Sequence, residues 1–138
     1  MMSGSTLHAP TAHRSFLAFD FGTQRVGVAT GNTLTGSARP LRTIAATGTA
    51  RFDAIARLIA EWQPDALVVG IPFHPDGAAH DNTERARRFA RQLHGRFGLT
   101  VHEVDERYTT TEALAAGAAD VDAASAAIIL EQFLGTLT

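Results

Sequence analysis

The chain has 138 residues, of which 45% are hydrophobic and 19% are charged, and its formal net charge is −2, which indicates one folded domain and excludes a disordered chain. It has no cysteine and all twelve of its basic residues are arginine, so disulfide scaffolds, zinc ribbons, thiol catalysis and lysine-dependent sites are excluded. A uniformly basic surface is also excluded, and any nucleic-acid binding therefore needs a local patch.

The sequence predicts neither a secretory signal nor a membrane-spanning helix. Residues 1–15 mix Ser, Thr, His, Gly and Pro without the apolar core of a secretory signal, and we interpret them as a disordered leader. No run approaches the roughly 18 apolar residues of a membrane helix. We therefore expect residues 16–138 to form a single domain in the cytoplasm, without a membrane partner.

Three strands are predicted at the start of this domain. A buried strand over Phe16–Asp20 is joined by a glycine-containing turn to a hairpin partner over Arg25–Thr30. Leu41–Ile44 is a weaker third strand, which follows a connection marked by Gly36 and Pro40. This part of the chain is therefore expected to be a β-meander.

Helices and strands are predicted to alternate in the rest of the domain. Apolar residues recur at helical spacing from Phe52 to Trp62, and the apolar run Ala66–Ile71 is typical of a parallel strand covered on both faces. The later predicted elements are a loop over Phe73–Asn82, a helix over Thr83–Phe97, a strand over Thr100–Val104, a helix that begins at the capping-box residues Thr109 and Glu112, and a last helix over Asp122–Leu134. This order predicts an α/β fold.

Three carboxylates stand at positions where such folds place functional groups. Asp20 and Glu106 follow strands, and Asp122 begins the last helix. Separately they could be a turn aspartate, a surface ion pair and a helix cap, but the carboxyl ends of strands in an open α/β sheet meet at one edge. Carboxylates gathered there would repel one another, and one or two Mg²⁺ or Mn²⁺ ions would relieve this. The sequence therefore predicts a catalytic metal site of Asp20, Glu106 and Asp122.

The predicted helix over Thr83–Phe97 is strongly basic. Five arginines and one glutamate give it a charge of +4, whereas the rest of the chain sums to −6. An ordinary solvated helix face would also account for this pattern. Charge concentrated in this way suits phosphate contacts, and the predicted substrate-binding residues here are Arg85, Arg88 and Arg91.

Four segments together resemble the YqgF family of Holliday-junction-resolvase-like proteins, known as pre-16S rRNA nucleases. The segments are Phe19–Ala29, Val68–Pro72, Val104–Thr110 and Val121–Leu130. The resemblance implies a ribonuclease H-like fold, with a five-stranded mixed sheet of order 3-2-1-4-5, an antiparallel second strand and helices on both faces. It also implies a metal-dependent nuclease that processes the 5′ end of the small-subunit ribosomal RNA precursor.

The same resemblance assigns residues and leaves alternatives open. The family's acidic positions fall on Asp20, Glu106 and Asp122, and its motif arginines fall on Arg25 and Arg107. No arginine follows Arg107, so substrate contacts are expected from the basic helix rather than from the C-terminal part. The alternatives to an RNA nuclease are a resolvase of branched DNA and a non-catalytic transcription or ribosome-assembly factor. We expect a monomer or a weak homodimer.

Overall fold

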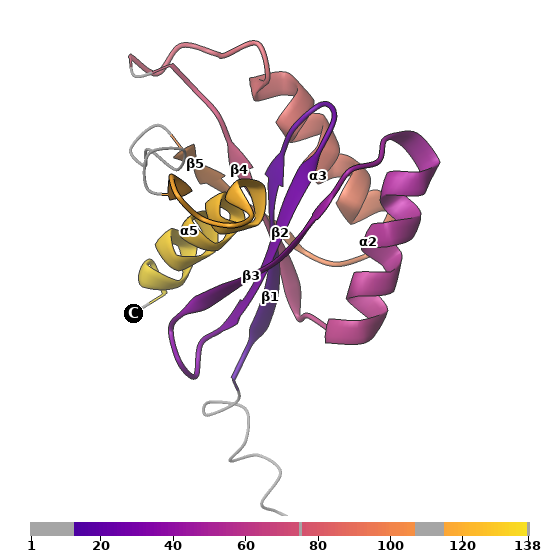
Figure 1. The fold of residues 1–138 in the computed structure, drawn as a ribbon, viewed down its shortest axis with the longest axis vertical. Coiled ribbons are helices and arrows are strands. Elements are labelled where there is room, and N and C mark those ends of the chain that lie inside the picture. The colour runs from indigo at the N-terminus through magenta and orange to yellow at the C-terminus, as the bar shows by residue number, and fades with distance from the viewer. Residues whose placement is uncertain (1–12, 75, 107–114, 138) are drawn as a thin grey trace, which may run out of the picture.

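A five-stranded sheet with helices on both faces makes up the described part of the chain, residues 13–74, 76–106 and 115–137, in the computed structural model (Figure 1). The strands are β1 (Ser15–Phe21), β2 (Val26–Asn32), β3 (Ala38–Ile44), β4 (Ala66–Ile71) and β5 (Val101–Asp105), and the helices are α2 (Gly48–Trp62), α3 (Thr83–Phe97) and α5 (Val121–Gly135). No helix in the described residues is long and apolar enough to cross a membrane.

The strand order is β3-β2-β1-β4-β5. β2 is antiparallel to both β1 and β3, whereas β4 is parallel to both β1 and β5. The predicted order and the predicted antiparallel second strand are therefore confirmed.

Alternate side chains of β1 enter two different cores. Leu17 and Phe19 are fully buried in the cluster beneath α2 and α3, where Phe19 packs edge-to-face against Phe89 of α3 with ring centroids 5.9 Å apart. Phe16 and Ala18 are fully buried in the cluster beneath α5. Since side chains alternate along a strand, Asp20 faces the α5 side of the sheet.

Small residues in β2 explain the alanine-rich C-terminal helix. α5 is apolar over most of its surface, and its Ala126 and Ala127 pack against Ala29 of β2. A Cβ atom added to Gly31 would lie 2.9 Å from the Leu130 side chain. Small residues on both elements therefore let α5 approach the sheet closely.

The N-terminal strand begins earlier than predicted. The Ser15 amide donates to the Asp65 carboxylate at 2.7 Å, and the Arg14 carbonyl accepts from the Thr33 amide at 2.9 Å. Ser15 is therefore part of the sheet rather than of the predicted leader. Residues 1–12 of that leader, Arg107 and the helix predicted to begin at Thr109 lie outside the described residues.

The loop after β4 places the start of α3. Phe73 and Ala79 form an isolated antiparallel bridge within this loop. The Thr83 hydroxyl then donates to the Pro72 carbonyl, directly after β4. The first turn of α3 therefore lies at the carboxyl end of β4.

Candidate active site

Asp20 lies between two glycines across the sheet. In the antiparallel ladder with β2 it stands opposite Gly27. In the parallel ladder with β4, Phe19 stands opposite Val69, so the next residue, Gly70, neighbours Asp20. The half-buried carboxylate of Asp20 is thus flanked on both sides by strand positions without side chains.

The carboxylate of Glu106 fills the space over Gly70. A Cβ atom added to Gly70 would lie 2.9 Å from the Glu106 carboxyl carbon and 2.9 Å from its Oε2 atom. Neighbouring strands are about 4.8 Å apart, so this carboxylate lies roughly one strand spacing from Asp20, on the same face.

Asp122 lies over the other glycine. A Cβ atom added to Gly27 would lie 1.9 Å from the Asp122 carbonyl oxygen, so the first turn of α5 rests directly on the β2 backbone. The fold thus brings Asp20, Glu106 and Asp122 to adjacent positions on one face, at the carboxyl ends of β1, β4 and β5. We call this group the acidic row.

Asp120, and not Asp122, caps α5. Its carboxylate accepts hydrogen bonds from the Ala123 amide at 3.0 Å and from the Thr43 hydroxyl of β3. Burial raises the pKa of Asp120, but these hydrogen bonds outweigh it and leave the pKa below its usual value. Because Asp120 has taken this role, the capping explanation for Asp122 does not apply.

Loss of the Asp120 cap should cost stability in a pH-dependent way. Asp120→Ala should lower the free energy of unfolding by about 1 kcal/mol at pH 7. The contribution is complete above the unfolded-state pKa of 3.8 and is lost as the pH falls through the lower folded-state pKa, so variant and wild type should converge at a pH below that folded-state pKa. Urea denaturation at several pH values measures this. Asp120→Asn is the control, because Asn caps nearly as well; equal losses for both variants at pH 7 would contradict the assignment.

The Asp122 side chain forms an ion pair with Arg25 in the turn between β1 and β2. The Arg25 Nε donates to Asp122 Oδ2 at 2.9 Å, and the side chains are 64% and 34% exposed. The motif arginine therefore contacts a carboxylate of the acidic row.

The acidic row suits a hard divalent cation in the type of its ligands. Carboxylate oxygens are the ligands that Mg²⁺ and Mn²⁺ prefer. Within residues 13–74, 76–106 and 115–137, however, no three His, Asp or Glu side chains are arranged to hold a metal ion. The contact with Arg25 is made through Asp122 Oδ2, and a carboxylate that accepts one hydrogen bond can still bind a metal ion through its second oxygen.

Arg51 supports the turn that carries Arg25, a role that sequence reasoning missed. It is 5% exposed, and its guanidinium donates to the Ala46 carbonyl at 2.8 Å and to the Thr23 carbonyl at 3.2 Å. Burial lowers its pKa. The available signal was its spacing, because Arg51 precedes Ile55 by four residues on the apolar face of α2.

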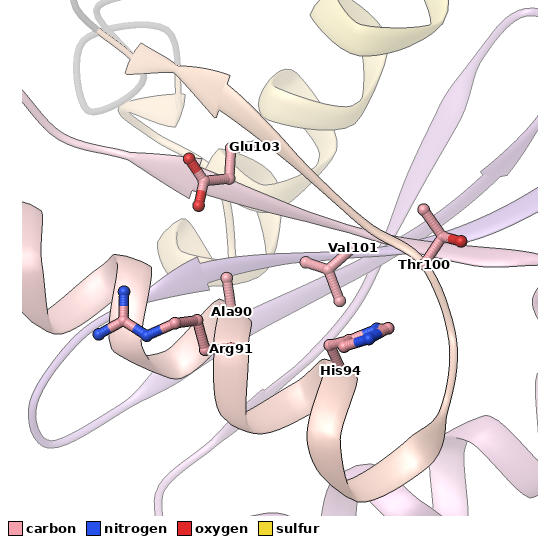
Figure 2. A pocket seen from close by; sticks show the side chains of 6 residues that line it. All are labelled: Ala90, Arg91, His94, Thr100, Val101 and Glu103. Carbon is pink, nitrogen blue, oxygen red and sulfur yellow. The ribbon is translucent and has the colours of Figure 1, made fainter.

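The arginines of α3 lie on the opposite face of the sheet from the acidic row. Arg85 and Arg88 are in the first two turns of α3, near the carboxyl end of β4. Arg91 is further along, 2.7 Å from Glu84, and it lines a cavity of about 480 Å³ between α3 and β5 (Figure 2). A substrate can contact both α3 and the acidic row by passing around the edge at the carboxyl ends of the strands.

Comparison with known proteins identifies close relatives. A family model described as "RuvX: Holliday junction resolvase" matches residues 14–136. A protein named "Putative pre-16S rRNA nuclease" from Polaromonas sp. is 71% identical over 130 residues, which are 94% of each chain. A protein of the same name from Albidiferax ferrireducens is 65% identical over 131 residues, covering 95% of this chain and 84% of the relative.

Solved structures of resolvases share the fold. Thermus thermophilus RuvC in complex with a Holliday junction substrate has a TM-score of 0.55 and 16% identity, over 90% of this chain and 95% of RuvC. The fowlpox virus Holliday junction resolvase has a TM-score of 0.54 and 9% identity, over 90% of this chain and 99% of the viral protein. At these identities the likeness shows the fold alone, and the predicted ribonuclease H-like architecture is confirmed.

Proposed function

This chain belongs to the RuvX family, and we propose that it is a cytoplasmic nuclease that hydrolyses phosphodiester bonds of structured RNA with the help of divalent metal ions. The proposed reaction is processing of the 5′ end of the small-subunit ribosomal RNA precursor, which the names of its relatives support. The observation that carries the proposal is the acidic row, in which two glycines allow Asp122 and Glu106 to lie beside Asp20.

Asp20, Glu106 and Asp122 are the proposed holders of one or two Mg²⁺ or Mn²⁺ ions. When bound, such ions make water a nucleophile at neutral pH and stabilise the charge on the leaving oxygen. Asp20 contributes a carboxylate from the rigid central strand, and Glu106 adds a second one from the end of β5. Asp122 at the start of α5 completes the set.

Substrate positioning is proposed for the exposed arginines nearest the carboxyl edge. Arg25 on the β1–β2 turn and Arg85 and Arg88 at the start of α3 approach this edge from opposite faces. A phosphate backbone that curves over the edge could contact all three. Arg91, further from the edge, would meet a more distant part of the strand, and the assignment of Arg107 rests on the motif alone.

A change at Arg88 should weaken RNA binding in a salt-dependent way. Arg88→Gln should reduce the slope of log affinity against log salt concentration by about 0.7–0.9, the value expected for one lost phosphate contact. The matched control is Arg96→Gln at the far end of α3, where Arg96 lies 4.0 Å above the Phe52 ring. Fluorescence anisotropy at several salt concentrations measures both. Equal slopes for Arg88→Gln and the wild type would remove Arg88 from the interface.

A choice of substrates tests the reaction itself. Ribosomal RNA precursor, single-stranded RNA and a four-way DNA junction are offered separately with Mg²⁺, and products are mapped at the 5′ end. The proposal expects cleavage of the precursor RNA and loss of cleavage on chelation of the metal. Cleavage that is unaffected by chelation, or confined to the junction, would overturn it.

Resolution of branched DNA is the second candidate, since the family model is described by that activity. A resolvase needs two active sites facing a symmetric junction, and therefore a dimer. Paired, symmetric cuts by a dimeric species would favour this reaction over RNA processing.

A further inference from the structure

Two histidine rings lie together in the loop between β4 and α3. The ring centroids of His74 and His80 are 5.1 Å apart, and the rings are tilted by 46° to each other. His74 is exposed and His80 is half-buried. The loop extends past the carboxyl end of β4, and the parallel strand β1 carries Asp20 to the same edge (Figure 1). An exposed aromatic surface therefore stands at the edge where the proposed reaction takes place.

Hydrogen bonds within the loop hold the two rings in place. The His74 amide donates to the Ala78 carbonyl at 2.9 Å, and the Gly77 amide donates to the His74 carbonyl at 2.8 Å. The His80 amide donates at 2.7 Å to the hydroxyl of Thr83, a residue that is 3% exposed. Because the same hydroxyl donates to the carbonyl that follows β4, the backbone that carries both rings is fixed to the sheet.

The first turn of α3 fixes the His80 ring. Its Nδ1 atom accepts a hydrogen bond from the Asn82 amide at 3.1 Å. A backbone N–H can only donate, so Nδ1 carries no hydrogen and the ring hydrogen is on Nε2. The ring is therefore neutral while this bond lasts. The Asn82 side chain accepts from the exposed Arg85 guanidinium at 3.2 Å, so one chain of hydrogen bonds links the His80 ring to a cation.

A neutral aromatic surface beside a guanidinium suits a nucleotide with an unpaired base. Bases stack on aromatic side chains, and arginine binds phosphate. The two rings are too close together to admit a base between them, so the base would lie on the exposed face of His74. Asp76 and Asp81 are exposed on the same loop, and their charges disfavour a phosphate at the rings themselves. Bases inside a duplex are covered by their neighbours and cannot make this contact.

On the basis of the proposed function, we propose that His74 stacks on an unpaired base of the substrate RNA, while Arg85 contacts the adjacent phosphate. His80 is a positioning residue that supports the His74 ring from behind. The loop then selects RNA that is single-stranded beside the cleavage site over RNA that is fully paired there.

RNA binding by the full chain tests the stacking contact. Fluorescence anisotropy is measured at pH 8 in EDTA, with a gel to verify that the RNA stays intact, for a single-stranded RNA and a duplex of the same length. His74→Ala should lower the affinity for the single strand by about fivefold or more and leave the affinity for the duplex unchanged. His74→Phe should restore the affinity, because it keeps an aromatic ring. The control His13→Ala, just before β1 at the opposite end of the sheet, should match the wild type.

The salt dependence distinguishes a stacked base from a phosphate contact. His74→Ala should lower the affinity by the same factor at every salt concentration, because a neutral ring displaces no counterions. Arg85→Gln should instead reduce the slope of log affinity against log salt concentration by about 0.7, the value for one phosphate of a single strand. A reduced slope for His74→Ala would make His74 a phosphate contact and overturn the stacking.

Two spectroscopic readouts follow the base and the ring. A fluorescent adenine analogue, placed at successive positions of the single strand, should change its emission at one position on binding to the wild type but not on binding to His74→Ala. Nuclear magnetic resonance spectra of the ring nitrogens should show the His80 hydrogen on Nε2. A hydrogen on Nδ1 would contradict the bond from Asn82 and overturn the positioning role of His80.

The outcomes separate this proposal from the proposed function. Equal affinities of the wild type and His74→Ala for the single strand, equal losses for single strand and duplex, or no recovery in His74→Phe would overturn the stacking contact, and the proposed nuclease would stand. No binding of either RNA by the wild type would overturn both proposals together.

Discussion

Replacing Asp20 with Asn should lower the rate of RNA cleavage by at least about a hundredfold, because even the outer partners of metal ligands typically contribute 10- to 100-fold. Asp20 is the central member of the acidic row, with Gly27 on one side and Gly70 on the other. The amide keeps the size of the side chain but removes the charge that attracts a cation. Cleavage of precursor RNA under single-turnover conditions, with Mg²⁺ in excess, measures the effect.

The fold of the Asp20→Asn variant should remain intact. Asn has nearly the same size and shape as Asp, so Asp20→Asn should leave the free energy of unfolding close to that of the wild type. A loss of activity together with unchanged unfolding would locate the effect in the chemistry.

Asp105→Asn is the matched control for Asp20→Asn. Asp105 also ends a parallel strand, but by alternation with Val101, which packs against the cluster beneath α3, it faces the other side of the sheet. Its replacement should change cleavage by less than a few-fold. If both variants lost activity equally, general charge at the sheet edge would explain the result and the specific role of Asp20 would be wrong.

The orientation of Asp20 could be predicted from the sequence because strand alternation is a local property. Its side chain must share a face with those of Phe16 and Ala18, whatever covers them. The strand order came from the family resemblance, since pairing of distant strands has no local signal. Neither source could show that Gly27 and Gly70 are the neighbours of Asp20 across the sheet, which depends on register.

For the basic helix, the sequence predicts the apolar side but not the position of the helix on the sheet. Helical spacing predicts which side of Thr83–Phe97 is apolar, and Phe89 and Leu93 are indeed buried there. It does not show which face of the sheet receives that side. The structure puts α3 across the sheet from α5, so the arginines and the acidic row are further apart than a shared edge alone implies.

The roles of Asp120 and Arg51 depend on partners far away in the chain. Asp120 is 77 residues from Thr43, and Arg51 is 28 residues from Thr23. Carboxylates and guanidinium groups look alike in a sequence whether they bind substrate or buried backbone. Only the partners distinguish these supporting residues from those of the acidic row.

Gly27→Ala should destabilise the fold by about 3 kcal/mol, the upper end of the usual cost of overpacking, and should also abolish cleavage. The added methyl carbon would lie 1.9 Å from the Asp122 carbonyl oxygen and 2.2 Å from its carbonyl carbon. Both atoms belong to helix backbone, which cannot move aside as a flexible side chain can. The first turn of α5 would have to lift from β2, and Asp122 would leave the acidic row with it. Urea denaturation and the cleavage assay measure the two effects.

The control for Gly27→Ala is a second Gly→Ala change at a site with free space. Gly95 lies in α3, and a Cβ atom added there would have no neighbour within 4 Å. Gly95→Ala should therefore stabilise the protein by roughly 0.5–1 kcal/mol through helix propensity and leave cleavage unchanged. If Gly27→Ala lowers the free energy of unfolding and Gly95→Ala raises it, the loss at Gly27 comes from the contact with α5. A Gly27→Ala variant with normal stability and activity would mean that α5 need not lie against β2, and the acidic row would lose its structural basis.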